Sequence, residues 1–231
     1  MKEKLRQALA ETRLREAELE DLGSDIPSDP TGRWHPKDHL AHIAWHRDRN
    51  ARLIEAVRTG GELPPKVDED VNAAIYAETR DQPVAEVIAA ARRSWDLLES
   101  VIEACTEEEW EQPMPDGPPG RKLMDGSPGD HLAAHLMWCH LEAGNKKAAE
   151  AILVWARDLS SRTSSDPRTH AVGAYNLACF YARTGQVVEA MPLLRESFGV
   201  VPDLRDWSHK DPDLDPIRDD PRIVELLGAP A

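Results

Sequence analysis

Apolar positions recur every three or four residues along most of the chain, and strict alternation of apolar and polar residues is absent from the sequence. The first spacing matches the 3.6 residues of an α-helical turn, whereas the second would have indicated β-strands. In the first predicted helix the apolar stripe comprises Leu5, Ala8, Leu9, Leu14 and Leu19. Predicted helices cover residues 2–22, 36–58, 71–80, 84–105, 130–142, 146–159 and a pair over about 168–198, with a short helix near the C-terminus. The sequence therefore predicts an all-α fold.

Prolines, glycines and capping residues mark the limits of these helices. Pro36 stands where the first turn of a helix tolerates proline, and Gly185 stands at the turn within the pair. Thr106 and Glu109 form a capping box that predicts one further helical turn. The segment 112–128 is dense in proline and glycine and is expected to be a loop.

Seven of the nine histidines fall in two short segments of the chain. They are His35, His39, His42 and His46 at the second predicted helix, and His131, His135 and His140 in the helix over 130–142. At about 100° per residue, His39 and His46 lie within about 60° of His42, on the arc that carries apolar residues. Imidazoles bind transition metals and carry protons. A metal site on inward helical faces is one interpretation, and hydrogen-bonded structural histidines are the alternative.

Two further polar residues extend this candidate site. His46 lies one turn after His42 and is a candidate proton shuttle, alternative ligand or hydrogen-bond partner of a ligand, with simple packing as the other interpretation. Glu142 follows His135 by two turns and could orient an imidazole or act as a base, whereas a solvated carboxylate at a helix end is the alternative. Five tryptophans in the same part of the chain could wall an apolar pocket or fill the core: Trp34, Trp45, Trp95, Trp110 and Trp138.

Composition excludes some classes of function. The formal net charge is −14, which argues against a nucleic-acid-binding surface, because phosphate neutralisation needs clustered Lys and Arg. The chain has no long apolar run and no apolar segment at its N-terminus, so we expect a cytoplasmic protein without a membrane span. Its three cysteines are far apart in sequence and are expected to be buried thiols.

Several motifs in residues 1–142 carry a resemblance to a known superfamily. They are Trp34, Lys37-Asp38, Leu40-Ala41-His42 and Trp45, the N-x-x-I-Y stretch from Asn72 to Tyr76, Trp95, and His131-x-x-x-His135. In these motifs the chain resembles the DinB-like superfamily of up-down four-helix bundles, and within it the ClbS/DfsB group. The resemblance implies a bundle over residues 1–144, followed by a helical extension over residues 145–231.

The resemblance also implies a site and an activity. By analogy, His42, His131 and His135 would hold a divalent transition metal, Zn, Ni or Fe. From their positions beside these ligands, we expect His46 and Glu142 to be catalytic residues. Trp34, Trp45, Asn72 and Trp138 would contact a small-molecule substrate. Relatives in this superfamily include transferases and isomerases that use a low-molecular-weight thiol, and the ClbS/DfsB group includes a hydrolase that opens a reactive cyclopropane. We therefore expect a metal-dependent hydrolase or thiol transferase that acts on a reactive electrophile in detoxification or self-protection. Whether the nucleophile is water or a thiol is left open.

The C-terminal part resembles a different family. A tetratricopeptide-type helix pair is similar to residues 168–198, which include YNLACFYARTGQVVEAMPLLRES. An Asp- and Pro-rich tail follows this pair. One pair is fewer than the three or so repeats that an independent solenoid needs, so it should pack on the preceding helices. The alternative function is a non-enzymatic ligand- or protein-binding module whose tetratricopeptide-like tail docks a partner protein. The oligomeric state is left open, with a homodimer as one alternative.

Overall fold

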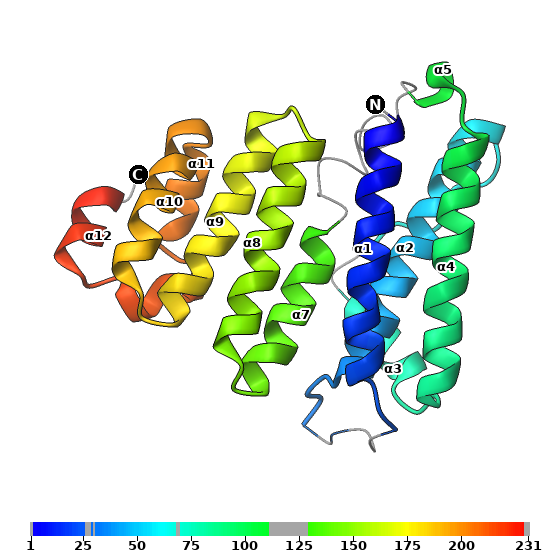
Figure 1. Ribbon diagram of the computed structural model, residues 1–231, viewed down its shortest axis with the longest axis horizontal. Coiled ribbons are helices and arrows are strands. Elements are labelled where there is room, and N and C mark those ends of the chain that lie inside the picture. The colour runs from blue at the N-terminus through cyan, green and yellow to red at the C-terminus, as the bar shows by residue number, and fades with distance from the viewer. Residues whose placement is uncertain (1, 26–28, 30, 68–69, 111–128, 229–231) are drawn as a thin grey trace. The chain divides into compact units, whose positions relative to one another are not determined.

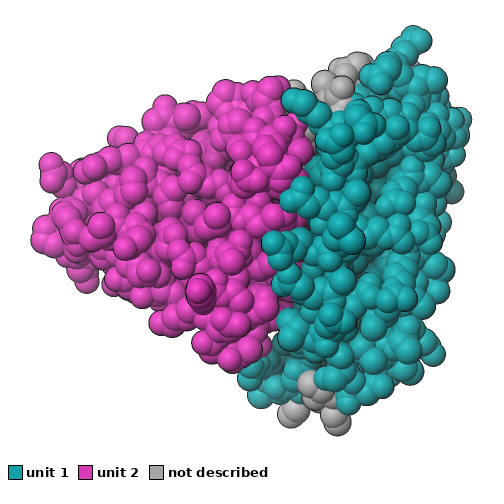
Figure 2. Space-filling view, viewed as in Figure 1, with its two compact units in different colours: residues 1–124 teal, residues 125–231 magenta. Residues whose placement is uncertain are grey.

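The computed structural model describes residues 2–25, 29, 31–67, 70–110 and 129–228, and every regular element within them is a helix. The all-α prediction is confirmed. The chain divides into two compact units, residues 1–124 and residues 125–231 (Figure 2). The division at residues 144 and 145 that the resemblance implies stays a prediction, and the predicted loop over 112–128 lies outside the described residues. Within the described part of the chain, no helix combines the length and apolar character that a membrane span requires.

Three long helices form the body of the first unit. Helices α1 (Lys2–Leu22), α2 (Pro36–Thr59) and α4 (Val84–Ala104) pack against one another, and the shorter α3 (Val71–Thr79) packs on α2 (Figure 1). The one-turn helix α5 (Glu107–Trp110) has the predicted capping box. The backbone N–H of Thr106 donates to the carboxylate of Glu109, and the backbone N–H of Glu109 donates to the hydroxyl of Thr106. Helices α1 to α4 begin and end within a residue of their predicted limits, and α5 is the predicted further turn.

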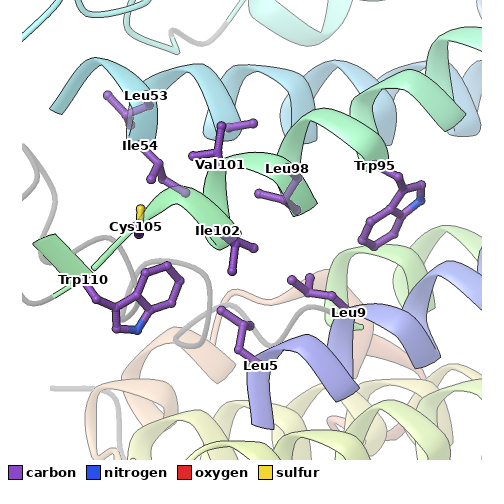
Figure 3. Packing of buried hydrophobic residues seen from close by; sticks show 11 residues of the cluster. Leu5, Leu9, Leu53, Ile54, Trp95, Leu98, Val101, Ile102, Cys105 and Trp110 are labelled. Carbon is purple, nitrogen blue, oxygen red and sulfur yellow. The ribbon is translucent and has the colours of Figure 1, made fainter. Parts of the chain in front are cut away.

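Apolar side chains from α1, α2, α4 and the segment through α5 pack together and form the core of the first unit (Figure 3). The cluster comprises Leu5, Leu9, Ala51, Leu53, Ile54, Trp95, Leu98, Val101, Ile102, Cys105 and Trp110. Leu14 was predicted to belong to the same stripe of α1, but its side chain is 77% exposed. At about 100° per residue it lies about 180° from Leu5, on the opposite side of the helix. Burial of Trp95 and Trp110 assigns those two tryptophans to the core.

A buried ion pair crosses the same three helices. Arg47 of α2 donates two hydrogen bonds to the carboxylate of Glu16 on α1, and the two side chains are 7% and 1% exposed. The guanidinium also donates to Ser94 of α4 and lies 4.0 Å from the ring centroid of Trp95. The indole N–H of Trp95 donates to Glu16 at 2.8 Å. Buried charges are tolerated when their polar atoms have hydrogen-bond partners, and here all three guanidinium nitrogens and both carboxylate oxygens have one.

The second unit is a succession of helices, each packed on the next. Helices α7 (Asp130–Glu142), α8 (Lys146–Thr163), α9 (Pro167–Arg183) and α10 (Val187–Val200) follow one another in this way (Figure 1). Gly185 has a φ of 75° in the turn before α10, a conformation that favours glycine. The helix pair over about 168–198 is therefore present, whereas its membership of the tetratricopeptide type stays a prediction.

The tail of the second unit is held by one buried aspartate. It contains α11 (Asp203–Ser208), the 3₁₀-helix η1 (Pro212–Ile217) and α12 (Pro221–Leu227). Asp211 accepts hydrogen bonds from the hydroxyl of Tyr175 at 2.7 Å and the indole N–H of Trp207 at 3.1 Å, and its other oxygen caps η1. These contacts connect α9, α11 and η1.

Candidate metal centre

The start of α2 is fixed by its own residues and by the chain that precedes α4. Pro36 occupies the first turn, and the backbone N–H of His35 donates to the carboxylate of Asp38 at 2.8 Å. The ammonium of Lys37 is buried and donates to the carbonyl oxygens of Arg80 and Gln82 at 2.6 and 2.9 Å. The helix that carries the first histidine cluster therefore begins at a defined position.

His42 lies among aromatic rings. Its side chain is buried, as the periodicity of α2 predicted, and its ring centroid is 5.1 Å from that of Trp34 and 4.5 Å from that of His46. Trp34 in turn stacks on Tyr76 of α3, with 6.2 Å between centroids and an interplanar angle of 12°. These rings limit the positions that the His42 imidazole can adopt.

His46 bonds to a residue that was predicted to contact the substrate. The side chains of His46 and Asn72 are hydrogen bonded, which joins α2 to α3. Burial lowers the pKa of His46, and the bond to Asn72 opposes that shift. Sequence reasoning missed this pair, because the two residues belong to different helices and nothing in their spacing connects them. The substrate role of Asn72 and the catalytic role of His46 stay predictions.

The predicted tryptophans of the site have different surroundings. Trp45 is partly buried, contacts His46 edge-on at 5.0 Å between centroids, and lines a cavity of about 260 Å³ bounded by α2, α3 and α4. Trp138 on α7 is 37% exposed and its ring lies 4.2 Å from the guanidinium of Arg183 on α9. A packing role for Trp138 is thus visible, and the substrate role of each of these tryptophans, as of Trp34, stays a prediction.

The second histidine cluster lies on α7. His131 and His135 are one turn apart, with ring centroids 4.9 Å from each other, so that both imidazoles project from the same side of the helix. His131 is exposed and His135 is partly buried. Glu142 is the exposed last residue of α7, and its catalytic role stays a prediction.

Three of these histidines form a group that could hold a metal ion. His42, His131 and His135 each offer one ring nitrogen, and the three atoms lie within 4.8 Å of one another. Three imidazoles are a donor set that zinc, nickel and iron accept, and a three-ligand set leaves further coordination positions for water or substrate. The chemistry of the donor set therefore fits a divalent transition metal without selecting one.

A comparison with protein-family models places the helices and histidines described above in one known superfamily. A family model described as the DinB superfamily matches residues 3–142, which is more than half of the chain and includes all three histidines. The chain belongs to the DinB superfamily. Searches among curated proteins and among solved structures found no match.

Proposed function

We propose that this protein is a metal-dependent enzyme of the DinB superfamily, in which His42, His131 and His135 bind one divalent transition metal. The observation that carries the proposal is the proximity of three imidazole nitrogens, within 4.8 Å of one another. Membership of the DinB superfamily supports it, because the matched residues include both histidine clusters.

A metal held by three neutral imidazoles supplies Lewis-acid chemistry: it polarises a substrate heteroatom or lowers the pKa of a nucleophile. The proposed substrate is a reactive small-molecule electrophile, attacked by water or by a low-molecular-weight thiol. Trp34 and Trp45 would present apolar faces to it, and His46 would accept or return a proton beside His42. Glu142 would serve as a second proton acceptor.

Elemental analysis tests the metal site directly. Protein purified without a histidine tag should contain close to one transition metal per chain. His42→Ala and His131→Ala should each lose that metal, because two imidazoles hold a transition metal weakly. His140→Gln is the matched control, since it changes a histidine of α7 outside the proposed ligand set. A native protein that contains no metal and takes up none on dialysis against zinc, nickel or iron would refute the proposal.

An activity panel tests the reaction class. The metal-loaded protein is offered reactive electrophiles, epoxides and strained rings among them, with water alone and with each of several thiols. We expect turnover that His135→Ala abolishes, and the requirement for a thiol distinguishes transfer from hydrolysis. Equal rates for the native protein and for this variant would contradict an enzymatic role for the site.

A binding module without catalysis is the second candidate. It is favoured by a cavity of about 630 Å³ in the second unit, which α8, α9 and α10 line with Val154, Leu177 and Leu193 and with the Arg157–Glu196 ion pair. Under this proposal the second unit would dock a protein. A metal-free protein whose thermal unfolding is unchanged by His42→Ala and His131→Ala would favour this candidate over the enzyme.

A further inference from the structure

The helix that carries His42 and His46 also carries the arginine of the buried ion pair. At about 100° per residue, Arg47 lies about 100° around α2 from His46 and about 140° from His42. The histidines and the arginine therefore occupy different faces of one helix. Any rotation of α2 about its axis that breaks the contacts of Arg47 also moves the two imidazoles.

The contacts of Arg47 leave little freedom for such a rotation. Its Nη1 and Nη2 donate to the two oxygens of Glu16 at 2.6 and 2.8 Å, and its Nε donates to the hydroxyl of Ser94 at 2.9 Å. Nη2 also donates to the carbonyl oxygen of Ala91 at 3.2 Å. A planar guanidinium satisfies acceptors on α1 and α4 together in only one orientation.

Other ion pairs of the first unit lack this combination of burial and geometry. In the Arg92–Glu20 pair the arginine side chain is 63% exposed, and in the Arg13–Glu99 pair both side chains are at least 35% exposed. Apolar packing of α2 on α1 and α4 is strong but non-directional, and it tolerates small rotations and shifts. Buried ion pairs contribute little net stability compared with apolar replacements, and their best-attested role is to select one arrangement among several.

We propose that Arg47 and Glu16 are positioning residues that set the rotation of α2 and hence the direction in which His42 and His46 project. This inference rests on the proposed metal site. Neither residue belongs to the ligand set, and the effect on the metal is exerted through the orientation of the helix. The pair should therefore affect metal affinity and coordination geometry more than it affects whether the chain folds.

The test uses the double variant Glu16→Gln, Arg47→Met in the full chain. It removes both charges, keeps side chains of similar length, and keeps a carbonyl oxygen for the indole N–H of Trp95. Cobalt(II) titration should show a dissociation constant weakened by roughly 10- to 100-fold, the range for residues that orient metal ligands, and altered visible absorption bands. The melting temperature of the metal-free protein should stay near that of the native protein. Ile54→Val is the matched control: it lowers the melting temperature through the core and should leave the cobalt spectrum unchanged.

Two outcomes separate this inference from the proposed function. If the native protein binds neither cobalt nor zinc, nickel or iron, the proposed function fails, and nuclear Overhauser effects between the ring protons of Trp34 and His42 decide the positioning role in the metal-free state. Retention of those contacts in the double variant, or an unchanged dissociation constant and spectrum where cobalt binds, overturns the inference.

Ser94→Ala removes one acceptor of Arg47 and provides a milder variant. It should weaken cobalt binding by a smaller factor, and no change in a well-folded Ser94→Ala protein also counts against the inference.

Discussion

A buried arginine–glutamate ion pair crosses the long helices of the first unit, whereas a buried carboxylate with neutral donors holds the tail of the second unit. The Arg47–Glu16 pair crosses three long helices that already share an extensive apolar core. Asp211 instead connects α9 to short elements, α11 and η1, that contribute few apolar side chains.

This difference indicates what each buried polar group contributes. Where apolar burial already holds the helices together, a directional ion pair mainly selects their orientation. Where apolar burial is sparse, hydrogen bonds to a central acceptor must keep the short elements in place. The following predictions test that distinction.

Removal of one charge of the buried pair should have the largest effect. Arg47→Ala leaves Glu16 buried without its cation, and breaking a buried pair in this way costs roughly 3–5 kcal/mol of unfolding free energy. Urea denaturation measures the change. Arg13→Ala, which removes partly exposed ion pairs with Glu99 and Asp96, is the control and should cost about 0–1 kcal/mol. Similar losses for the two variants would show that burial of the Arg47 pair is irrelevant to stability.

Removal of the buried carboxylate should have a smaller effect, confined to the second unit. Asp211→Ala leaves the hydroxyl of Tyr175 and the indole of Trp207 without their acceptor, at a cost of roughly 1–3 kcal/mol. Asp211→Asn retains an acceptor oxygen and should cost less. Amide exchange followed by mass spectrometry should show faster exchange in α11 and η1, with α1, α2 and α4 unaltered. Faster exchange spread evenly over both units would contradict a local role for Asp211.

Alkaline pH should weaken the second unit gradually. Burial raises the pKa of the Tyr175 hydroxyl and of the Cys179 thiol, and the nearby charge of Asp211 raises both further. Because both folded pKa values lie above the unfolded ones, their contribution to stability is complete below the unfolded pKa values. That contribution is lost as pH rises above about 9 for the thiol and 10 for the phenol.

Urea denaturation at pH 8 and at pH 10.5 measures this loss, which is at most about 1.4 kcal/mol per pH unit for each group. The Tyr175→Phe, Cys179→Ala double variant should show a shallower decline between the two values. Tyr181→Phe offers a comparison in the same helix, because burial and its bond to Glu150 raise the pKa of Tyr181 to about 12. An equally steep decline in the double variant would rule out these two groups as its source.

Much of the helical architecture follows from local sequence. Apolar periodicity, together with proline, glycine and capping residues, predicted the limits of α1 to α4 and of α7 and the extra turn α5, because these signals act on the backbone nearby. The end of α8 was predicted at residue 159, but the helix continues to Thr163. Ser161 and Thr163, residue types that often indicate a loop, instead donate hydrogen bonds to carbonyls of the preceding turn. The helices α11 and η1 were not predicted, because long-range contacts hold them.

The candidate site was predictable to a similar extent. Periodicity placed His42 on the inward face of α2 and paired His131 with His135, since both depend on spacing along one helix. The bond between His46 and Asn72 and the ion pair between Arg47 and Glu16 were missed. Each joins residues on different helices, and a single sequence contains no record of which side chains meet after folding.

The packing of α7 has a practical consequence for anyone who trims this chain. The family match ends at residue 142, where α7 also ends, yet the partner of that helix is α8, which lies wholly beyond the match. A recombinant fragment cut at the family limit would lack Leu153 and Ala156 of α8, which line a common cavity with the buried Ala133 and Met137 of α7, and would leave those two side chains more exposed to water. Because α7 packs on α8, we expect the family portion alone to hold His131 and His135 less firmly, and its expression should yield insoluble or metal-deficient material.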